Sequence, residues 1–203
     1  MKPILERIAP NITSMIRMDH THVVAAFHRF RADLSPQRKD ALVRHVCLAL
    51  EIHAQLEEEI FYPALRRVLP ENAELQKSEP EHAQMKQLIA QLKASEAGSE
   101  SFDDTFLKLM RTVIHHVADE ESVLLPAAEH VLAQDLSRLG ALMTKRRIEL
   151  LAPHGGEAAV TGAQTFPVGT AALAVGGLAL AAALAVWSSR PDRGGRSSFM
   201  SLR

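Results

Sequence analysis

The chain has 203 residues and carries 23 basic against 24 acidic side chains, so its formal net charge is -1. This balance gives no reason to expect nucleic acid as a partner, because such binding depends on a surplus of lysine and arginine. Apolar residues make up 47% of the sequence and aromatic residues 4%, with long stretches of leucine, alanine, glutamate and lysine. These residues favour helices, so the composition predicts an all-α domain with an appendage.

The single cysteine, Cys47, excludes an internal disulfide framework and is consistent with a reducing compartment. Within its predicted helix it is interpreted as a small apolar residue. Charged residues recur through the first 20 positions, where a signal peptide needs an apolar run, so no signal peptide is predicted.

Helix-start signals predict two long helices in the first part of the chain. The first begins near Thr13 or Ser14 and ends at about residue 31. Ser35 and Pro36 mark the second start, since serine is a good N-cap and proline suits the first helical position. We expect the second helix to continue to about residue 69, with Pro63 kinking its last two turns.

Three further helices are predicted after a connection at residues 70–72. The third carries His82 and ends near Gly98. The fourth starts at Ser101 and spans about 102–132, because acidic residues in a first turn suit the helix dipole. The fifth is looser and follows directly.

Four long helices with short connections predict an antiparallel up-down four-helix bundle. Its core is expected at about residues 12–135. The looser fifth helix, at about 135–150, completes a predicted domain of residues 1–152.

The composition changes abruptly after this domain. Residues 153–167 form a predicted linker, residues 168–187 are an uninterrupted apolar run, and residues 188–203 are a basic tail. A helix over that apolar run would be about 30 Å long, the thickness of the hydrocarbon core of a bilayer. Trp187 stands at its end, where interfacial aromatic residues occur. The run therefore predicts a transmembrane helix.

The alternatives for the apolar run are an alanine-rich helix packed on the bundle and a low-complexity tail. Four arginines after the run favour a cytoplasmic carboxyl terminus, which would place the bundle on the other side of the membrane. Against this, nothing at the amino end would export the bundle, and Lys145, Arg146 and Arg147 precede the run. We therefore expect a cytoplasmic bundle that is anchored to a membrane by its carboxyl terminus.

One phrase occurs twice in the chain, 63 positions apart. Residues 53–64 read HAQLEEEIFYPA and residues 116–127 read HVADEESVLLPA. A shorter echo lies 62 positions apart, where Asp19-His20 matches Glu81-His82. The order acid-His, His-x3-Glu, acid-His, His-x3-Glu is typical of a duplicated helical hairpin that carries a two-metal site.

Helical periodicity places the repeated residues on shared faces. His53 and Glu57 are four residues apart and point the same way, and His116 and Glu120 repeat this arrangement. Four imidazoles and two carboxylates suit iron, manganese or zinc, and carboxylates from opposite helices can bridge two cations. The predicted metal ligands are His20, His53, Glu57, His82, His116 and Glu120.

A simpler interpretation exists for each of these residues taken singly. A buried histidine on a helix is usually a core residue, and Glu57, Glu58 and Glu59 alone would form a solvated charge run. Independent core packing has no reason to reproduce His, Glu, Glu, Pro and Ala at one fixed offset, so the joint pattern favours a metal site.

On these residues the chain resembles the hemerythrin-like, HHE cation-binding family over roughly residues 12–135. The resemblance implies an up-down four-helix bundle with a non-haem centre of two iron ions, manganese or zinc being less expected. It also implies a small-molecule ligand such as oxygen, nitric oxide or peroxide. The matching segments are Asp19-His20, His53 to Pro63, Glu81-His82 and His116 to Glu121.

The sequence departs from oxygen-carrying members of that family on the third helix. Those proteins have His-x3-His there, whereas Ser78 lies four residues before His82 and Lys86 four residues after it. Glu79 could replace the missing imidazole, since Glu-x-x-His is itself a di-metal spacing, although Pro80 argues against it. A changed ligand set favours sensing or peroxide handling over simple oxygen carriage.

Several neighbouring residues stay open as ligands or supporting groups. Glu58 and Glu121 follow the predicted carboxylate ligands directly. His115 competes with His116, because a His-x4-Glu spacing to Glu120 is also allowed in the family, but the repeat offset favours His116. Tyr62 is the only tyrosine and is assigned to packing.

Three functions are weighed on this evidence. The first is a di-iron binding protein that binds or senses oxygen, nitric oxide, iron or redox state at a membrane. The second is a di-iron peroxidase or oxidase, for which no catalytic residue is assigned. The third is a metal-free helical interaction module.

Overall fold

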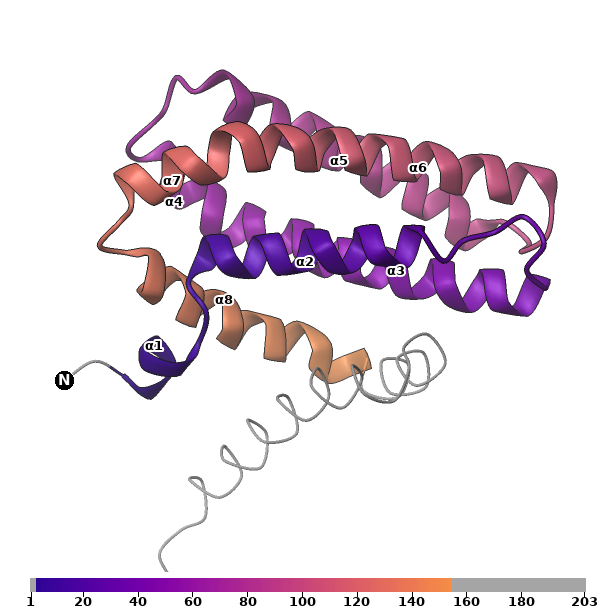
Figure 1. The fold of residues 1–203 in the computed structure, drawn as a ribbon, viewed down its shortest axis with the longest axis horizontal. Coiled ribbons are helices and arrows are strands. Elements are labelled where there is room, and N and C mark those ends of the chain that lie inside the picture. The colour runs from indigo at the N-terminus through magenta and orange to yellow at the C-terminus, as the bar shows by residue number, and fades with distance from the viewer. Residues whose placement is uncertain (1–2, 155–203) are drawn as a thin grey trace, which may run out of the picture. The chain divides into compact units, whose positions relative to one another are not determined.

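The computed structural model describes residues 3–154, and within them it is all-helical. The long helical segments lie side by side with alternating chain direction (Figure 1), which is an antiparallel up-down bundle. Its segments are α2 (Ile12–Phe27), α3 (Pro36–Leu56) with its continuations, α5 (Ala73–Ala94), and α6 (Glu100–Asp119) with its continuations. A short helix α1 (Ile4–Ile8), the helix α8 (Leu136–Leu151) and a 3-10 turn at Ala152–His154 flank them.

Each bundle segment begins at a residue whose side chain accepts a hydrogen bond from the first helical turn. The predicted cap before α3 has this role, but α6 begins earlier than expected, with Ser99 rather than Ser101 as its cap. Gly98 precedes it with φ of 97°, a backbone conformation that favours glycine. The capping residues are Asn11, Ser35, Asn72 and Ser99.

The predicted kinks at Pro63 and Pro126 take the form of π turns just before each proline. Glu57–Phe61 and Glu120–Leu124 are π-helical, and the chain then continues as α4 (Tyr62–Arg66) and α7 (Leu125–Val131). The Tyr62 N–H donates to the Glu57 carbonyl, five residues back, instead of four. Such single π turns occur often at functional sites, and each one here starts at a predicted metal ligand.

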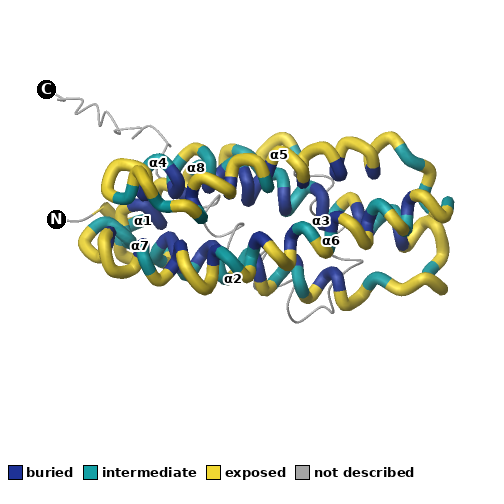
Figure 2. Tube along the Cα trace, turned by 90° about the horizontal axis from the view of Figure 1, so that it is seen from above, coloured by how far each residue is buried: buried dark blue, intermediate teal, exposed yellow. Residues whose placement is uncertain are grey.

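The bundle interior consists of two apolar layers with a polar layer between them. One apolar layer includes Ile16, Leu56 and Leu125, and the other includes Phe27, Leu50 and Phe106. Every bundle segment passes from one layer to the other, and the buried side of each faces the interior in Figure 2. The histidine of each segment lies where it crosses from one apolar layer to the other.

Helix α8 extends the structure beyond the four-segment bundle. It packs against α1, α2 and α3 at the end that holds the first apolar layer. Gly140 allows this close approach, because a Cβ atom there would lie 2.2 Å from the Pro10 carbonyl oxygen. The turn between α1 and α2 is thereby held directly against α8.

The prediction of a membrane-anchored protein needs correction. Within residues 3–154 no helix is long and apolar enough to cross a bilayer. The predicted transmembrane segment, residues 168–187, and the basic tail lie outside the residues that the structure describes. The described structure thus gives no support to a membrane location.

Candidate metal centre

The structure brings the six predicted ligands together in the polar layer of the bundle. Each is at most 5% exposed, and Glu57 and His82 are completely buried. Their inward atoms lie close together, with His53 Nε2 at 3.2 Å and His82 Nε2 at 3.3 Å from Glu57 Oε2. His20 Nε2 lies 3.3 Å from Glu120 Oε2.

The six side chains form two overlapping groups of ligand atoms. His20, His53, Glu57 and Glu120 each offer one atom within 4.8 Å of the others, and Glu57 forms a second such group with His82 and His116. Glu57 therefore belongs to both groups. His116 Nε2 is also 3.8 Å from Glu120 Oε2, so both carboxylates stand between imidazoles of different helices.

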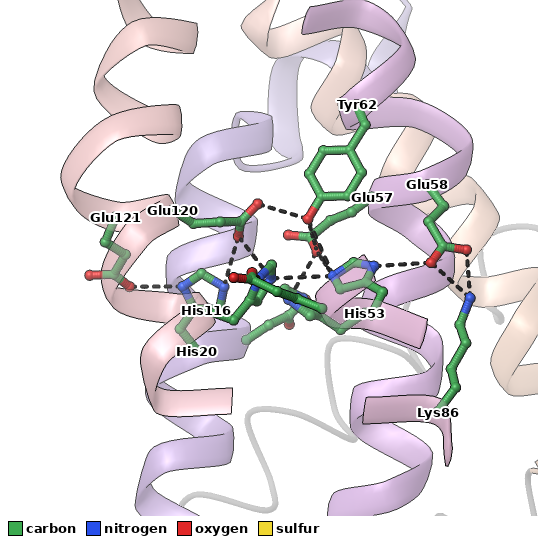
Figure 3. A network of polar contacts seen from close by, with 12 residues as sticks. His20, His53, Glu57, Glu58, Tyr62, Lys86, His116, Glu120 and Glu121 are labelled. Atoms are coloured by element: carbon green, nitrogen blue, oxygen red, sulfur yellow. Dashed lines mark hydrogen bonds and ion pairs between the residues drawn. The ribbon is translucent and has the colours of Figure 1, made fainter. Parts of the chain in front are cut away.

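Each imidazole is held from behind by a carboxylate that accepts from its Nδ1–H. Every one of these carboxylates comes from a neighbouring helix, and the outward nitrogen is thereby fixed while Nε2 points inward. Figure 3 shows two of them, Glu58 and Glu121, on opposite sides of the cluster. The pairs are His20 with Glu121 at 2.9 Å, His53 with Asp19 at 3.3 Å, His82 with Glu58 at 3.0 Å, and His116 with Glu81 at 2.7 Å.

The four supporting carboxylates occupy equivalent positions in the two halves of the repeat, and each one supports an imidazole on a different helix from its own. Asp19 and Glu81 precede the isolated histidines in sequence, yet each orients the imidazole of a different helix. Glu58 and Glu121, for which a ligand or a supporting role was open, stand behind the imidazoles. The second glutamate of each repeated phrase thus serves to hold an imidazole of a neighbouring helix in place.

Two residues that were considered as ligands are not part of the cluster. The side chain of Glu79 is 60% exposed and accepts from Arg66 at 2.7 Å. The side chain of His115 is 74% exposed and lies 3.8 Å from Asp119 on the surface of α6. The histidine that reaches the cluster is His116, in agreement with the offset of the repeat.

Tyr62 reaches the cluster, although it was assigned to packing. Its hydroxyl donates to Glu120 at 3.0 Å and to Glu57 at 3.3 Å, and lies 3.2 Å from His82 Nε2 (Figure 3). In a regular α-helix a residue five positions after Glu57 would point elsewhere. The π turn brings residue 62 round onto the face of Glu57, and the proline one residue later was the only signal for it in the sequence.

Burial and the central carboxylates act in opposite directions on the imidazoles of the cluster. Burial lowers the pKa of His53 to about 4 and also lowers the pKa values of His82 and His116, which keeps these imidazoles neutral and able to bind metal. Against the effect of burial, the adjacent Glu120 carboxylate and the charge of Glu57 raise the pKa of His20 to about 9. Burial, and then the nearby Glu120 carboxylate, raise the pKa of Glu57 well above its usual range. A cation between Glu57 and Glu120 would relieve this repulsion.

The buried polar atoms without hydrogen bonds point to the same conclusion. Five side-chain nitrogen or oxygen atoms in the described part of the chain are buried and lack such a partner. Three of them belong to the cluster, namely His20 Nε2, Glu57 Oε1 and Glu120 Oε2. Unsatisfied polar atoms are costly inside a protein, and metal coordination would satisfy all three. The donor set and its burial therefore fit divalent metal ions.

A small cavity lies beside the cluster, on the side of the second apolar layer. Its volume is about 10 Å3, and all four histidines line it. Apolar side chains such as Val23, Leu50, Met85 and Ile89 also line it, together with the charged side chains of Asp19, Glu51 and Lys86. A cavity of this size holds about one water-sized molecule.

Comparison with known proteins agrees with this geometry. Residues 11–128 match the family described as hemerythrin HHE cation binding domain. A protein of Nostoc sp. (strain PCC 7120) named DNA nickase is 33% identical over 125 residues, which are 62% of this chain and 35% of that protein. The chain thus spans about a third of the length of that relative. No solved structure matches the chain at a significant level.

Proposed function

Since the chain belongs to the hemerythrin HHE cation-binding family, we propose that its central cluster holds two iron ions and binds oxygen, nitric oxide or a related diatomic molecule. The observation that carries the proposal is the set of four inward imidazole nitrogens around two buried carboxylates. His20, His53, Glu57, His82, His116 and Glu120 are the proposed ligands. Manganese or zinc would also suit these donors, but iron is typical of the family.

When bound, a pair of iron ions supplies the electrons and open coordination positions that reversible binding of a diatomic molecule needs. The chain itself supplies the pocket and its polarity. The cavity of about 10 Å3 admits only a very small molecule, and apolar side chains stand beside the imidazoles in its walls. This size supports binding or sensing over turnover of larger substrates.

Tyr62 supplies a proton donor at the edge of the cluster. Burial and the two adjacent carboxylates raise its pKa well above the usual range, so the phenol keeps its proton. Its single O–H group lies within hydrogen-bond distance of the carboxylates of both Glu120 and Glu57, which accept from it. The position equivalent to Tyr62 in the second repeat is Leu125, so only one half of the cluster has this donor.

Metal analysis combined with optical spectroscopy tests the proposal. After anaerobic iron loading we expect about two iron ions per chain, and a reversible spectral change when the reduced protein meets oxygen or nitric oxide. His53→Ala and His116→Ala should abolish this change, while His130→Ala, at an exposed histidine, should not. A wild-type protein that retains well under two metal ions per chain would contradict the proposal.

Rapid mixing separates binding from catalysis. If the reduced protein consumes peroxide or oxygen over many turnovers instead of forming a stable adduct, the peroxidase or oxidase alternative is favoured. If replacing His53 and His116 leaves both the fold and any partner binding intact and no metal is bound, the helical interaction module is favoured.

A second candidate, cleavage of DNA, comes from the name of the Nostoc relative. The net charge of -1 gives no reason to expect a nucleic-acid partner, so the absence of DNA binding remains a prediction. Incubating supercoiled plasmid with the metal-loaded protein tests it, with catalase added to suppress radical damage from released iron. Nicking that survives catalase and is lost in His53→Ala would favour this candidate.

A further inference from the structure

The carboxylates that hold the imidazoles differ in what faces their outer side. Asp19 accepts from both terminal nitrogens of Arg147, one of them at 2.8 Å. Glu58 accepts at both oxygens from the Lys86 ammonium, at 2.7 Å each. A cation supplied by the chain therefore stands behind each of these two carboxylates.

Glu81 is the counterpart of Asp19 in the repeat, but its surroundings are different. Among residues 3–154 no lysine or arginine nitrogen lies within 4.0 Å of its carboxylate. The Lys77 ammonium, one turn back on α5, donates to Glu74 at 2.8 Å, and the Glu81 charge makes only the smallest contribution to raising the pKa of Lys77. The place that Arg147 takes behind Asp19 has no such side chain behind Glu81.

Two side chains of types that can bind metal, His115 and Asp119, lie close to the Glu81 carboxylate instead. His115 and Asp119 lie one turn apart on the same face of α6, with Nε2 and Oδ2 3.8 Å apart. Together with Glu81 they offer one imidazole nitrogen and two carboxylate oxygens within 4.8 Å of one another. This donor set suits a divalent transition-metal ion, with water completing the coordination.

The exposure of the three side chains indicates an exchangeable site. His115 is 74% exposed, Asp119 33% and Glu81 20%, so an ion can arrive directly from solvent. Glu81 also accepts from His116 Nδ1 at 2.7 Å, and His116 belongs to the buried cluster. One carboxylate thus connects the surface group to the interior.

We propose that Glu81, His115 and Asp119 form a second, surface site for a divalent transition-metal ion, which stands behind Glu81 as Arg147 stands behind Asp19. This site is where ions bind first on their way to the buried cluster. The surface site is independent of the function proposed above, whereas the loading role rests on it.

Calorimetric titration of the metal-free, full-length protein with Zn2+ tests the site. The wild type should bind zinc tightly at the buried cluster and bind one further, weaker equivalent. His115→Ala and Asp119→Asn should weaken that equivalent by at least about tenfold, since even a supporting residue of a metal site contributes about that much. His130→Ala, the matched exposed control on α7, should behave as wild type.

The outcomes separate this proposal from the function of the centre. If the weakly bound zinc ion has the same affinity in wild type, His115→Ala and Asp119→Asn, the surface site is overturned. Glu81, His115 and Asp119 are then ordinary solvated side chains. Absence of the tight equivalents in every variant would overturn the buried centre while leaving the surface site standing.

Cobalt loading measures the second part of the proposal. The visible absorbance of Co2+ should develop more slowly in His115→Ala, in proportion to the lost occupancy of the surface site, and reach the same final value as in wild type. Equal initial rates in wild type, His115→Ala and His130→Ala would rule out the loading role.

Discussion

At the scale of single residues, each imidazole of the cluster is fixed at one nitrogen and presents the other. Helical spacing together with the repeat was enough to predict the six central residues, because residues four apart share a face and the repeat adds His20 and His82. The partners behind them could not be predicted in the same way. Whether Asp19 supports His20 or His53 depends on how the neighbouring helices are rotated, and the structure gives His53.

Removing the Tyr62 hydroxyl should destabilise the metal-free protein. In Tyr62→Phe the buried carboxylates of Glu57 and Glu120 lose a hydrogen-bond donor while the aromatic ring still packs. We expect a loss of about 1–3 kcal/mol in the free energy of unfolding, measured by urea denaturation. The metal-loaded protein should lose less, because the ions then satisfy the carboxylates. A larger loss in the loaded form would contradict this role.

The thiol of Cys47 should be unreactive while the protein is folded. Burial raises its pKa to about 12, so at pH 8 the folded protein holds the neutral form. In the unfolded chain the thiol ionises near its ordinary pKa of about 8.5, so the folded state binds the proton more tightly and this contribution to stability falls as the pH rises above that value.

Labelling with a disulfide reagent measures this. Between pH 7 and pH 9 we expect the labelling rate of the native protein to be set by the small fraction of unfolded molecules. The labelling rate in denaturant should increase with pH. Rapid stoichiometric labelling of Cys47 in the native protein would contradict this, because it would show that the thiol is accessible in the folded state.

At the scale of elements, the two π turns explain both a success and a failure of sequence-based prediction. The prolines at 63 and 126 predicted irregular turns at matching positions, and the structure has them there. A periodicity of 3.6 residues could not predict that Tyr62 faces the cluster. The extra residue in the turn changes the face on which residue 62 lies, and no α-helical projection contains it.

Helix α8 should influence the centre through a single side chain. Arg147 binds Asp19, which in turn holds His53, so Arg147→Ala should loosen that imidazole. We expect metal affinity to fall by about 10- to 100-fold, measured by competition with a chelator.

The adjacent arginine is the matched control. Arg146 binds Glu59 through an ion pair in which both side chains are about one third exposed. Arg146→Ala should therefore leave metal affinity unchanged and have little effect on stability, because exposed ion pairs contribute little. Equal effects of the two substitutions would mean that α8 acts through general docking and not through Asp19.

Gly140 should not tolerate alanine, despite the usual preference of helices for alanine. The added Cβ would meet the backbone of Pro10 and Asn11, which cannot move as a flexible side chain could. We expect Gly140→Ala to lower stability by about 1–3 kcal/mol in thermal or urea unfolding, whereas Ser137→Ala on the same helix should be nearly neutral. A stabilised Gly140→Ala protein would show that α8 can shift away from this contact.

At the scale of the whole molecule, the order of apolar and polar stretches along each helix sets the architecture. Helix number, direction and the position of the histidine layer follow from the sequence, because each segment has apolar residues on both sides of its histidine. The docking of α8 onto α1, α2 and α3 could not be predicted in this way. It depends on a close backbone contact at Gly140, which leaves no periodic signal in the sequence.

Metal removal should therefore lower stability without dismantling the bundle. The polar layer contains two buried carboxylates and several polar atoms without hydrogen bonds, and bound ions would stabilise it, whereas the apolar layers on either side do not depend on metal. With free metal about 1,000-fold above its dissociation constant, the stabilisation is about 4 kcal/mol. Chelation should lower the melting temperature accordingly in calorimetry, while the helical circular dichroism of the cool protein stays unchanged. In His53→Ala the chelator should have little further effect, because a protein that no longer holds the ions has none of this stabilisation to lose.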